Sequence, residues 1–170
     1  ETILDGHCSG RLLLDELTLR HFASKLWATG CERYGQGDLH HTVEDFERSF
    51  RFLEHTHAKG SQARAQATLG HCYLQQDRLD QAVDRASNSL KLRQQRADSL
   101  EAGGADEASD GANLASGDCD EDDESSESLA CIVLVKARIK QGDTAGAHAQ
   151  IDALLARNPD HLLLAAVCEE

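Results

Sequence analysis

The sequence predicts an all-α fold built from helical hairpins, and three observations point to it. Helix-favouring residues are abundant, while the 170-residue chain has one Pro, four Phe, two Tyr and one Trp. In three stretches, apolar residues recur at helical spacing on both sides of a short polar turn. These stretches follow one another at regular intervals once a highly acidic segment is set aside. A chain of this length can bury a substantial core.

Residues 1–25 are predicted to form a flanking helix. Apolar residues recur at helical spacing from Leu12 to Tyr34, so the alternative is a first hairpin helix that extends upstream. Because the chain begins at Glu1 rather than at Met, we expect a fragment or a processed product.

Residues 26–96 are predicted to hold two hairpins, each made of a helix, a tight turn and a second helix. The turns fall at Gly37-Asp38 and Asp77-Arg78, between apolar runs with helical spacing. Gly30 and Gly70, 40 residues apart, lie in the first helices of the two hairpins. Because glycine has no side chain, we expect the second helix of each hairpin to pack closely against it.

Residues 97–128 are predicted to form a disordered acidic insertion. This segment carries twelve of the 30 acidic residues and no Lys or Arg, in a chain of formal net charge −13. It has too few large apolar residues to offset the entropy of ordering. The simplest interpretation is a solvated loop. The more specific interpretation is that the acidic segment attracts a basic partner, or competes for a basic groove of the same chain. Ser125, Ser126 and Ser128 are then candidate phosphorylation sites.

Residues 129–160 are predicted to hold a third hairpin. Its turn at Gly142 follows the second turn by 65 residues, and Pro159 ends its second helix. Val135 stands where the other hairpins have a small residue, so its packing is expected to be looser. Residues 161–170 are predicted to begin a further helix that is cut off.

These intervals are typical of the tetratricopeptide (TPR) repeat, a helical hairpin of about 34 residues. The interval of 40 residues equals one repeat plus a six-residue extension through the loop 55–60, and the interval of 65 equals one repeat plus the insertion. A single hairpin cannot bury its apolar face alone, so stacking makes the core. The sequence therefore predicts a TPR-like helical-hairpin solenoid with a disordered acidic insertion.

Several short stretches resemble a more specific family. They are Leu26-Trp27, Phe46-Glu47-Arg48-Ser49, Ala58-Lys59-Gly60, residues 69–74, Leu79-Asp80-Gln81-Ala82, Ala130-Cys131, residues 150–154 and residues 158–162. They are similar to the meiosis-specific TPR proteins, the sporulation proteins that promote crossovers with the synapsis-initiation (Zip) group and their testis-expressed animal relative. The resemblance runs from about Leu26 to the C-terminus, and the acidic insertion is its main departure.

The resemblance implies a scaffold of meiotic prophase that does no chemistry. Such a protein would associate with chromosomes in the nucleus and recruit crossover and synapsis factors to the assembling synaptonemal complex. The alternative is a general cytosolic TPR adaptor, for example in transport or protein turnover. An enzyme with an unrecognised site comes third.

A partner-binding face follows from TPR geometry, because the first helices of the repeats line the concave side of the array. The predicted binding residues on that face are Trp27, Tyr34, Arg64, His71, Gln75, Lys136 and Lys140. The three cations make the face mildly basic, so we expect an acidic or C-terminal segment of a partner. A chaperone-tail receptor is disfavoured, because the first repeat offers Trp27 and Cys31 where such clamps carry Lys and Asn.

Other classes of function are disfavoured by what the sequence lacks. The negative net charge argues against nucleic acid as a ligand, and no apolar run reaches the roughly twenty residues that span a bilayer. There is no signal peptide, lipidation motif, phosphate-binding loop or hydrolase elbow. We therefore expect neither a small-molecule substrate nor a cofactor. The six scattered cysteines indicate a reducing cytosolic or nuclear compartment.

Two histidine groups are weaker candidates for chemistry. The pairs His40-His41 and His55-x-His57 could bind a metal, but they lack an evident partner Cys or carboxylate set, so solvated histidines and no metal site are expected. His71 and Cys72 are neighbours on a predicted helix. They point about 100° apart and so do not form a nucleophile–base pair.

Overall fold

A computed structural model describes residues 14–102 and 121–157, and within them the chain is helical with no strand, which confirms the all-α class. None of the described helices is long and apolar enough to cross a lipid bilayer. The helices are α2 (Glu16–Gly35), α3 (Leu39–Leu53), α4 (Lys59–Gln75), α5 (Leu79–Ala102), α6 (Glu121–Lys140) and α7 (Thr144–Arg157).

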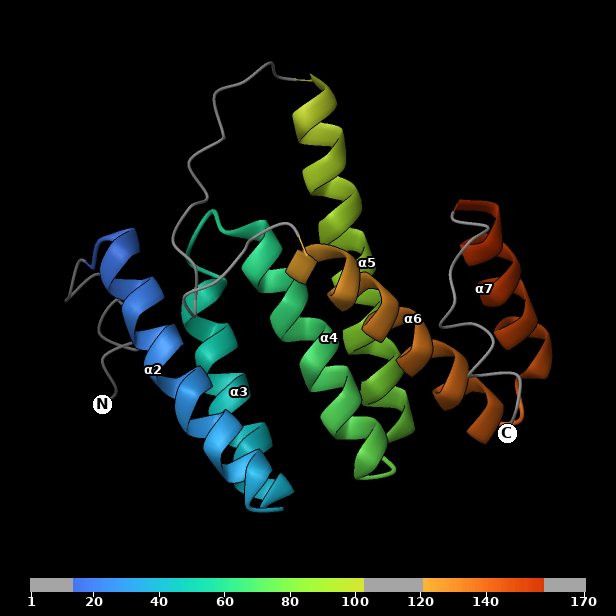
Figure 1. The fold of residues 1–170 in the computed structure, drawn as a ribbon, viewed down its shortest axis with the longest axis horizontal. Helices are drawn as coiled ribbons and strands as arrows, with labels where there is room; N and C mark the ends of the chain where they lie inside the picture. The colour runs from blue at the N-terminus through green and yellow to red at the C-terminus, as the bar shows by residue number, and fades with distance from the viewer. Residues whose placement is uncertain (1–13, 103–120, 158–170) are drawn as a thin grey trace.

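The helices form three antiparallel pairs that follow one another across the molecule (Figure 1). α2 packs against α3, α4 against α5, and α6 against α7. Neighbouring pairs also pack against each other, because α3 contacts α4 and α6 contacts both α4 and α5. The first helix of each pair is therefore α2, α4 or α6.

The same turn joins the two helices of each pair. Its middle residue has a left-handed backbone, with φ of 79° at Gly37, 59° at Asp77 and 79° at Gly142. The next N–H reaches back to close the helix: Arg78 donates to the carbonyl of Tyr73 at 2.9 Å, and the equivalent bonds in the first and third turns measure 3.1 and 2.9 Å. This pattern satisfies carbonyls that a helix C-terminus leaves free. The three predicted turn positions are confirmed.

Two glycines allow the helices of the first two pairs to approach closely, as predicted. A Cβ atom on Gly70 would lie 3.3 Å from the backbone oxygen of Ala82 and 3.3 Å from the backbone nitrogen of Ala86. On Gly30 it would lie 2.6 Å from the ring of Phe46. A larger residue at either position would have to push the second helix or its side chain away.

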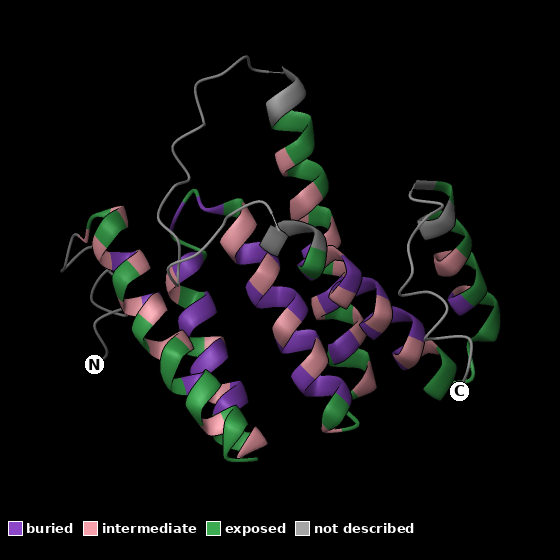
Figure 2. Ribbon diagram, in the orientation of Figure 1, coloured by how far each residue is buried: buried purple, intermediate pink, exposed green. Residues whose placement is uncertain are grey.

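The core is continuous through α2 to α6, and buried residues line the sides on which these helices meet (Figure 2). Its largest fully buried side chains include Leu19, Leu53, Leu69, Tyr73, Val133, Leu134 and Val135. Buried alanines belong to the same core. Since Val135 is itself buried, the third pair accommodates it inside the core.

The structure corrects both ends of the predicted insertion 97–128. α5 continues to Ala102, and α6 already begins at Glu121. Ser126 and Ser128 are buried, and Arg93 of α5 donates to the Ser126 hydroxyl. Acidic residues at a helix N-terminus interact favourably with the helix dipole, so the acidic composition of 121–124 is compatible with helix.

The structure also corrects the boundary placed between residues 25 and 26. α2 runs unbroken from Glu16 to Gly35, so the flanking helix and the first hairpin helix are one element. Asp15 caps it by accepting a hydrogen bond from the Thr18 N–H at 2.7 Å. The predictions for residues 1–13, 103–120 and 158–170, among them Pro159 and the further helix, lie outside the described residues.

Candidate functional site

The seven predicted binding residues all lie on α2, α4 and α6, the first helices of the three pairs. We call the surface that they form the first-helix face; its residues are Trp27, Tyr34, Arg64, His71, Gln75, Lys136 and Lys140. Two groups of side chains meet there across the gap between α2 and α4, and α6 adds positive charge.

The first group joins Trp27 of α2 to Arg64 of α4. The Trp27 ring packs on Phe46 with ring centroids 4.5 Å apart, so part of it is anchored to the core. The Arg64 guanidinium lies 6.0 Å from the centroid of the Trp27 ring. Such a cation–π contact contributes about 0.5–1 kcal/mol at an exposed site. The pair places a positive charge over an aromatic ring.

The second group is a hydrogen-bonded cluster of Tyr34, His71 and Gln75. The Gln75 amide donates to the Tyr34 hydroxyl at 2.9 Å, and its nitrogen lies 2.9 Å from Nε2 of His71. The Tyr34 hydroxyl is 3.4 Å from the same imidazole nitrogen. Tyr34 remains 39% exposed, so the cluster links α2 to α4 and still faces solvent.

The His71 imidazole is held toward its neutral form. Burial lowers its pKa, and the positive charge of Lys136 on α6 lowers it further. A neutral Nε2 accepts a hydrogen bond, which suits the amide N–H of Gln75. The face therefore combines these hydrogen-bonding groups with the cations of Arg64 on α4 and Lys136 on α6.

Lys140 is engaged elsewhere. Its Nζ lies 3.1 Å from Oδ1 of Asp77, in the turn of the second pair. Gln141 donates to Asp80 at 2.8 Å beside it. These contacts fasten the end of α6 to the start of α5, and the Asp77 carboxylate offsets the charge that Lys140 adds to the first-helix face.

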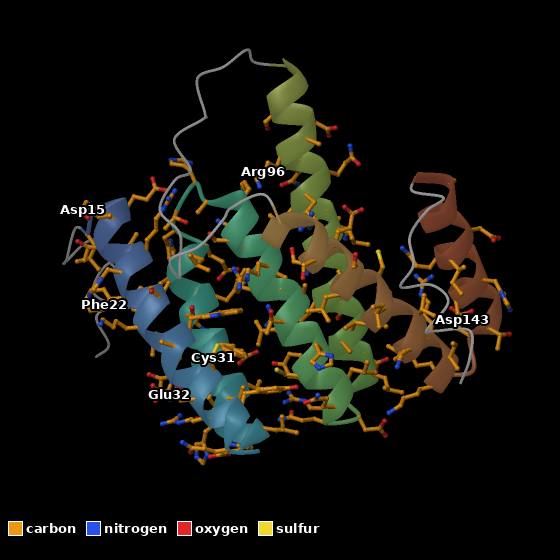
Figure 3. The ribbon with its side chains drawn as sticks, in the orientation of Figure 1. Asp15, Phe22, Cys31, Glu32, Arg96 and Asp143 are labelled. Atoms are coloured by element: carbon orange, nitrogen blue, oxygen red, sulfur yellow. The ribbon has the colours of Figure 1, made fainter. Side chains whose placement is uncertain are left out.

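The two cysteines near the face differ in exposure, while burial raises the pKa of both thiols. Cys31 is exposed, and Figure 3 shows it on the side of α2 that faces the interior of the molecule. Cys72 is fully buried, and burial followed by the neighbouring Cys31 raises the pKa of its thiol to about 11. Cys72 is thus a protonated thiol at neutral pH. This supports the spacing argument that His71 and Cys72 do not act as a dyad.

Two surface features escaped the sequence analysis. One is an open groove of about 360 Å³ between α3, α4 and α5, which no sequence motif marks and which is lined by Phe50, Glu54, Gln62, Gln66, Asn88, Lys91, Leu92 and Gln95. The other is Glu44, which lies beside His40 and His41. The argument that these histidines lack a carboxylate was wrong, and the spacing of four residues between His40 and Glu44 was the missed signal.

In chemical terms the first-helix face provides an aromatic ring, hydrogen-bonding groups and two cations. It holds no activated nucleophile among the described residues. Groups of these kinds can recognise a ligand by hydrogen bonds and by charge. No family model matches the chain, and neither a curated protein nor a solved structure matches it significantly.

Proposed function

We propose that this chain is a TPR-like solenoid that scaffolds other proteins by binding an acidic segment of each along the first-helix face. The observation that carries the proposal is the meeting of Tyr34, His71 and Gln75 across two successive hairpins, at 2.9 to 3.4 Å. A face built from consecutive first helices suits an extended segment better than a compact ligand.

The repeated turn supports the solenoid. Three hairpins close their first helices with the same left-handed residue and the same backward hydrogen bond. Each hairpin is then flanked by the next one, as in arrays whose units cannot bury their apolar faces alone. The residues 103–120 would form an insertion between the second and third units.

Charge supports an acidic segment as the occupant. Arg64 precedes the neutral His71 on α4, and the charge of Lys136 acts on it from α6, so both cations can attract carboxylates to this face. The Tyr34 hydroxyl and the Gln75 amide are placed to bond the backbone of an extended peptide. Exposed charge pairs are screened by salt, so this binding is expected to weaken as ionic strength rises.

The resemblance to the meiosis-specific TPR family supports a role in meiotic prophase. On this proposal the partners are crossover and synapsis factors, the complex lies on chromosomes in the nucleus, and the chain promotes crossover formation without chemistry of its own. A general cytosolic adaptor would use the same face. The meiotic scaffold and the general adaptor are therefore distinguished by the cellular effect of losing the chain.

The test is a gene disruption in the source organism, scored by univalent chromosomes at metaphase of the first meiotic division. Many univalents with normal vegetative growth are expected. Normal bivalents with a vegetative defect would contradict the meiotic role and favour the adaptor. The disrupted cells are then complemented with either the R64E/K136E chain or the K25E/K91E chain. K25E/K91E is the control, because it changes the net charge by the same amount at exposed positions outside the first-helix face. Only the second is expected to restore bivalents.

A further inference from the structure

Two histidines and a glutamate meet at the start of α3. One ligand atom from each of His40, His41 and Glu44 lies within 4.8 Å of the others. His40 Nδ1 is 3.7 Å from Glu44 Oε1, and the two imidazole rings are 5.3 Å apart at 76°. Both histidines are exposed, so a solute reaches them without any opening of the fold.

Asp38 orients one of these histidines. Its Oδ2 lies 2.7 Å from Nδ1 of His41, while its Oδ1 accepts the His41 backbone N–H at 3.3 Å and caps α3. With the proton on Nδ1, the lone pair of His41 is on Nε2. A carboxylate behind a histidine is the usual outer support of a metal ligand.

We propose that His40, His41 and Glu44 bind one divalent transition-metal ion of the zinc class. Two imidazole nitrogens and a carboxylate oxygen are ligand types that Zn²⁺ takes, with water completing the tetrahedron. Bonds of about 2.0–2.2 Å require ligand atoms roughly 3.3–3.6 Å apart. Exposed side chains at a helix start can make that adjustment by rotation about their own bonds.

Competing interactions at the site are weak. Arg48 approaches Glu44 at 3.9 Å, and a surface ion pair of this kind contributes about 0–1 kcal/mol. The ion would also link His40 to His41 and Glu44, near the start of α3. Binding therefore is expected to stabilise the start of α3 against fraying.

The test is calorimetric titration of the untagged full chain with ZnCl₂ at pH 7.5. The wild-type chain is expected to bind one more equivalent of Zn²⁺ than the H40A/H41A variant, and E44Q is expected to weaken that site at least tenfold. The D38N variant keeps a helix cap and is expected to lose about 10- to 100-fold in affinity for it. H55A/H57A is the matched control, with an exposed histidine pair outside the cluster, and should titrate like the wild type.

A Co²⁺ titration separates this site from binding by thiols. The equivalent that is lost in H40A/H41A is expected to lack thiolate charge-transfer bands, and Zn²⁺ is expected to raise the melting temperature of the wild type more than that of the variant. Equal stoichiometry and affinity in the wild type and H40A/H41A would overturn the proposal. So would a wild-type chain that binds no Zn²⁺. Circular dichroism checks that each variant is folded.

Discussion

Ser49 and Ser89, forty positions apart, make the same buried hydrogen bond in successive hairpins. Each hydroxyl donates to a backbone carbonyl 26 residues earlier, on the first helix of its own hairpin, at 2.8 Å in the first hairpin and 2.7 Å in the second. Both serines are fully buried. Each hairpin thus has the same hydrogen bond between its two helices, at the same position along them. This bond limits how far one helix can slide along the other.

Replacing either serine by alanine is expected to destabilise the fold. S49A and S89A should each lower the free energy of unfolding by about 1 kcal/mol, because a buried hydrogen bond of this kind is lost. Urea denaturation followed by circular dichroism measures the change. S99A removes an exposed hydroxyl that bonds a helix carbonyl of α5, so it is the control and should have little effect. An equal loss in the free energy of unfolding for S99A and S89A would contradict a specific contribution of the buried hydrogen bonds.

Gly70 is expected to tolerate no large side chain. G70L should lower the free energy of unfolding by about 1–3 kcal/mol, because its Cβ would already lie 3.3 Å from the backbone of α5 and the rest of the side chain would overpack the interface. The matched control is G35L, since a Cβ at Gly35 meets nothing within 4 Å. Equal stability of G70L and the wild type would contradict the close approach of α4 and α5.

His71 is expected to make stability depend on pH. Its folded pKa is lowered by burial and by Lys136, while the unfolded value is about 6.5. As pH falls through 6.5, the unfolded chain therefore takes up a proton more readily than the folded one. The free energy of unfolding is full above that pH and declines as pH falls toward the folded pKa.

The measurement is the melting temperature between pH 7.5 and 5.5. Over this range it should fall less steeply in H71Q than in the wild type. H148Q, which replaces an exposed histidine of α7, is the control for a general effect of removing an imidazole. A wild-type slope retained in H71Q would show that His71 is not the group responsible.

Deleting residues 97–128 is expected to destabilise the chain, contrary to what the acidic composition indicates. The deletion removes the first turns of α6, where Ser126 and Ser128 are buried and Glu127 lies 3.7 Å from Arg93. Thermal melting compares the deleted chain with the wild type. An unchanged melting temperature would mean that these contacts contribute nothing to the fold.

The turns and the close-packed glycines were predictable because their signals are local. Gly37 and Gly142 suit a left-handed backbone, and Gly30 and Gly70 recur at one interval. The same local signals led to the binding residues on the first helices.

The limits of the acidic segment were not predictable, because composition averaged over a segment hides a helix start that is stabilised by contacts with α5. The ion pair of Lys140 was not predictable for a similar reason. Its partner Asp77 is 63 residues away, and the sequence carries no sign of that pairing. The buried hydrogen bonds of Ser49 and Ser89 were not predicted, because a serine within a helix ordinarily bonds its own helix or faces solvent.

Binding of acidic peptide segments to the first-helix face can be tested on the purified chain. The most direct measurement is selection of a phage-displayed peptide library on the purified chain, followed by binding of the selected peptides to R64E/K136E and to K25E/K91E, with thermal melting to check both folds. We expect this proposal to yield peptides rich in Asp and Glu that bind the wild type and K25E/K91E and bind R64E/K136E at least tenfold more weakly. Selected peptides that bind all three chains equally would contradict it.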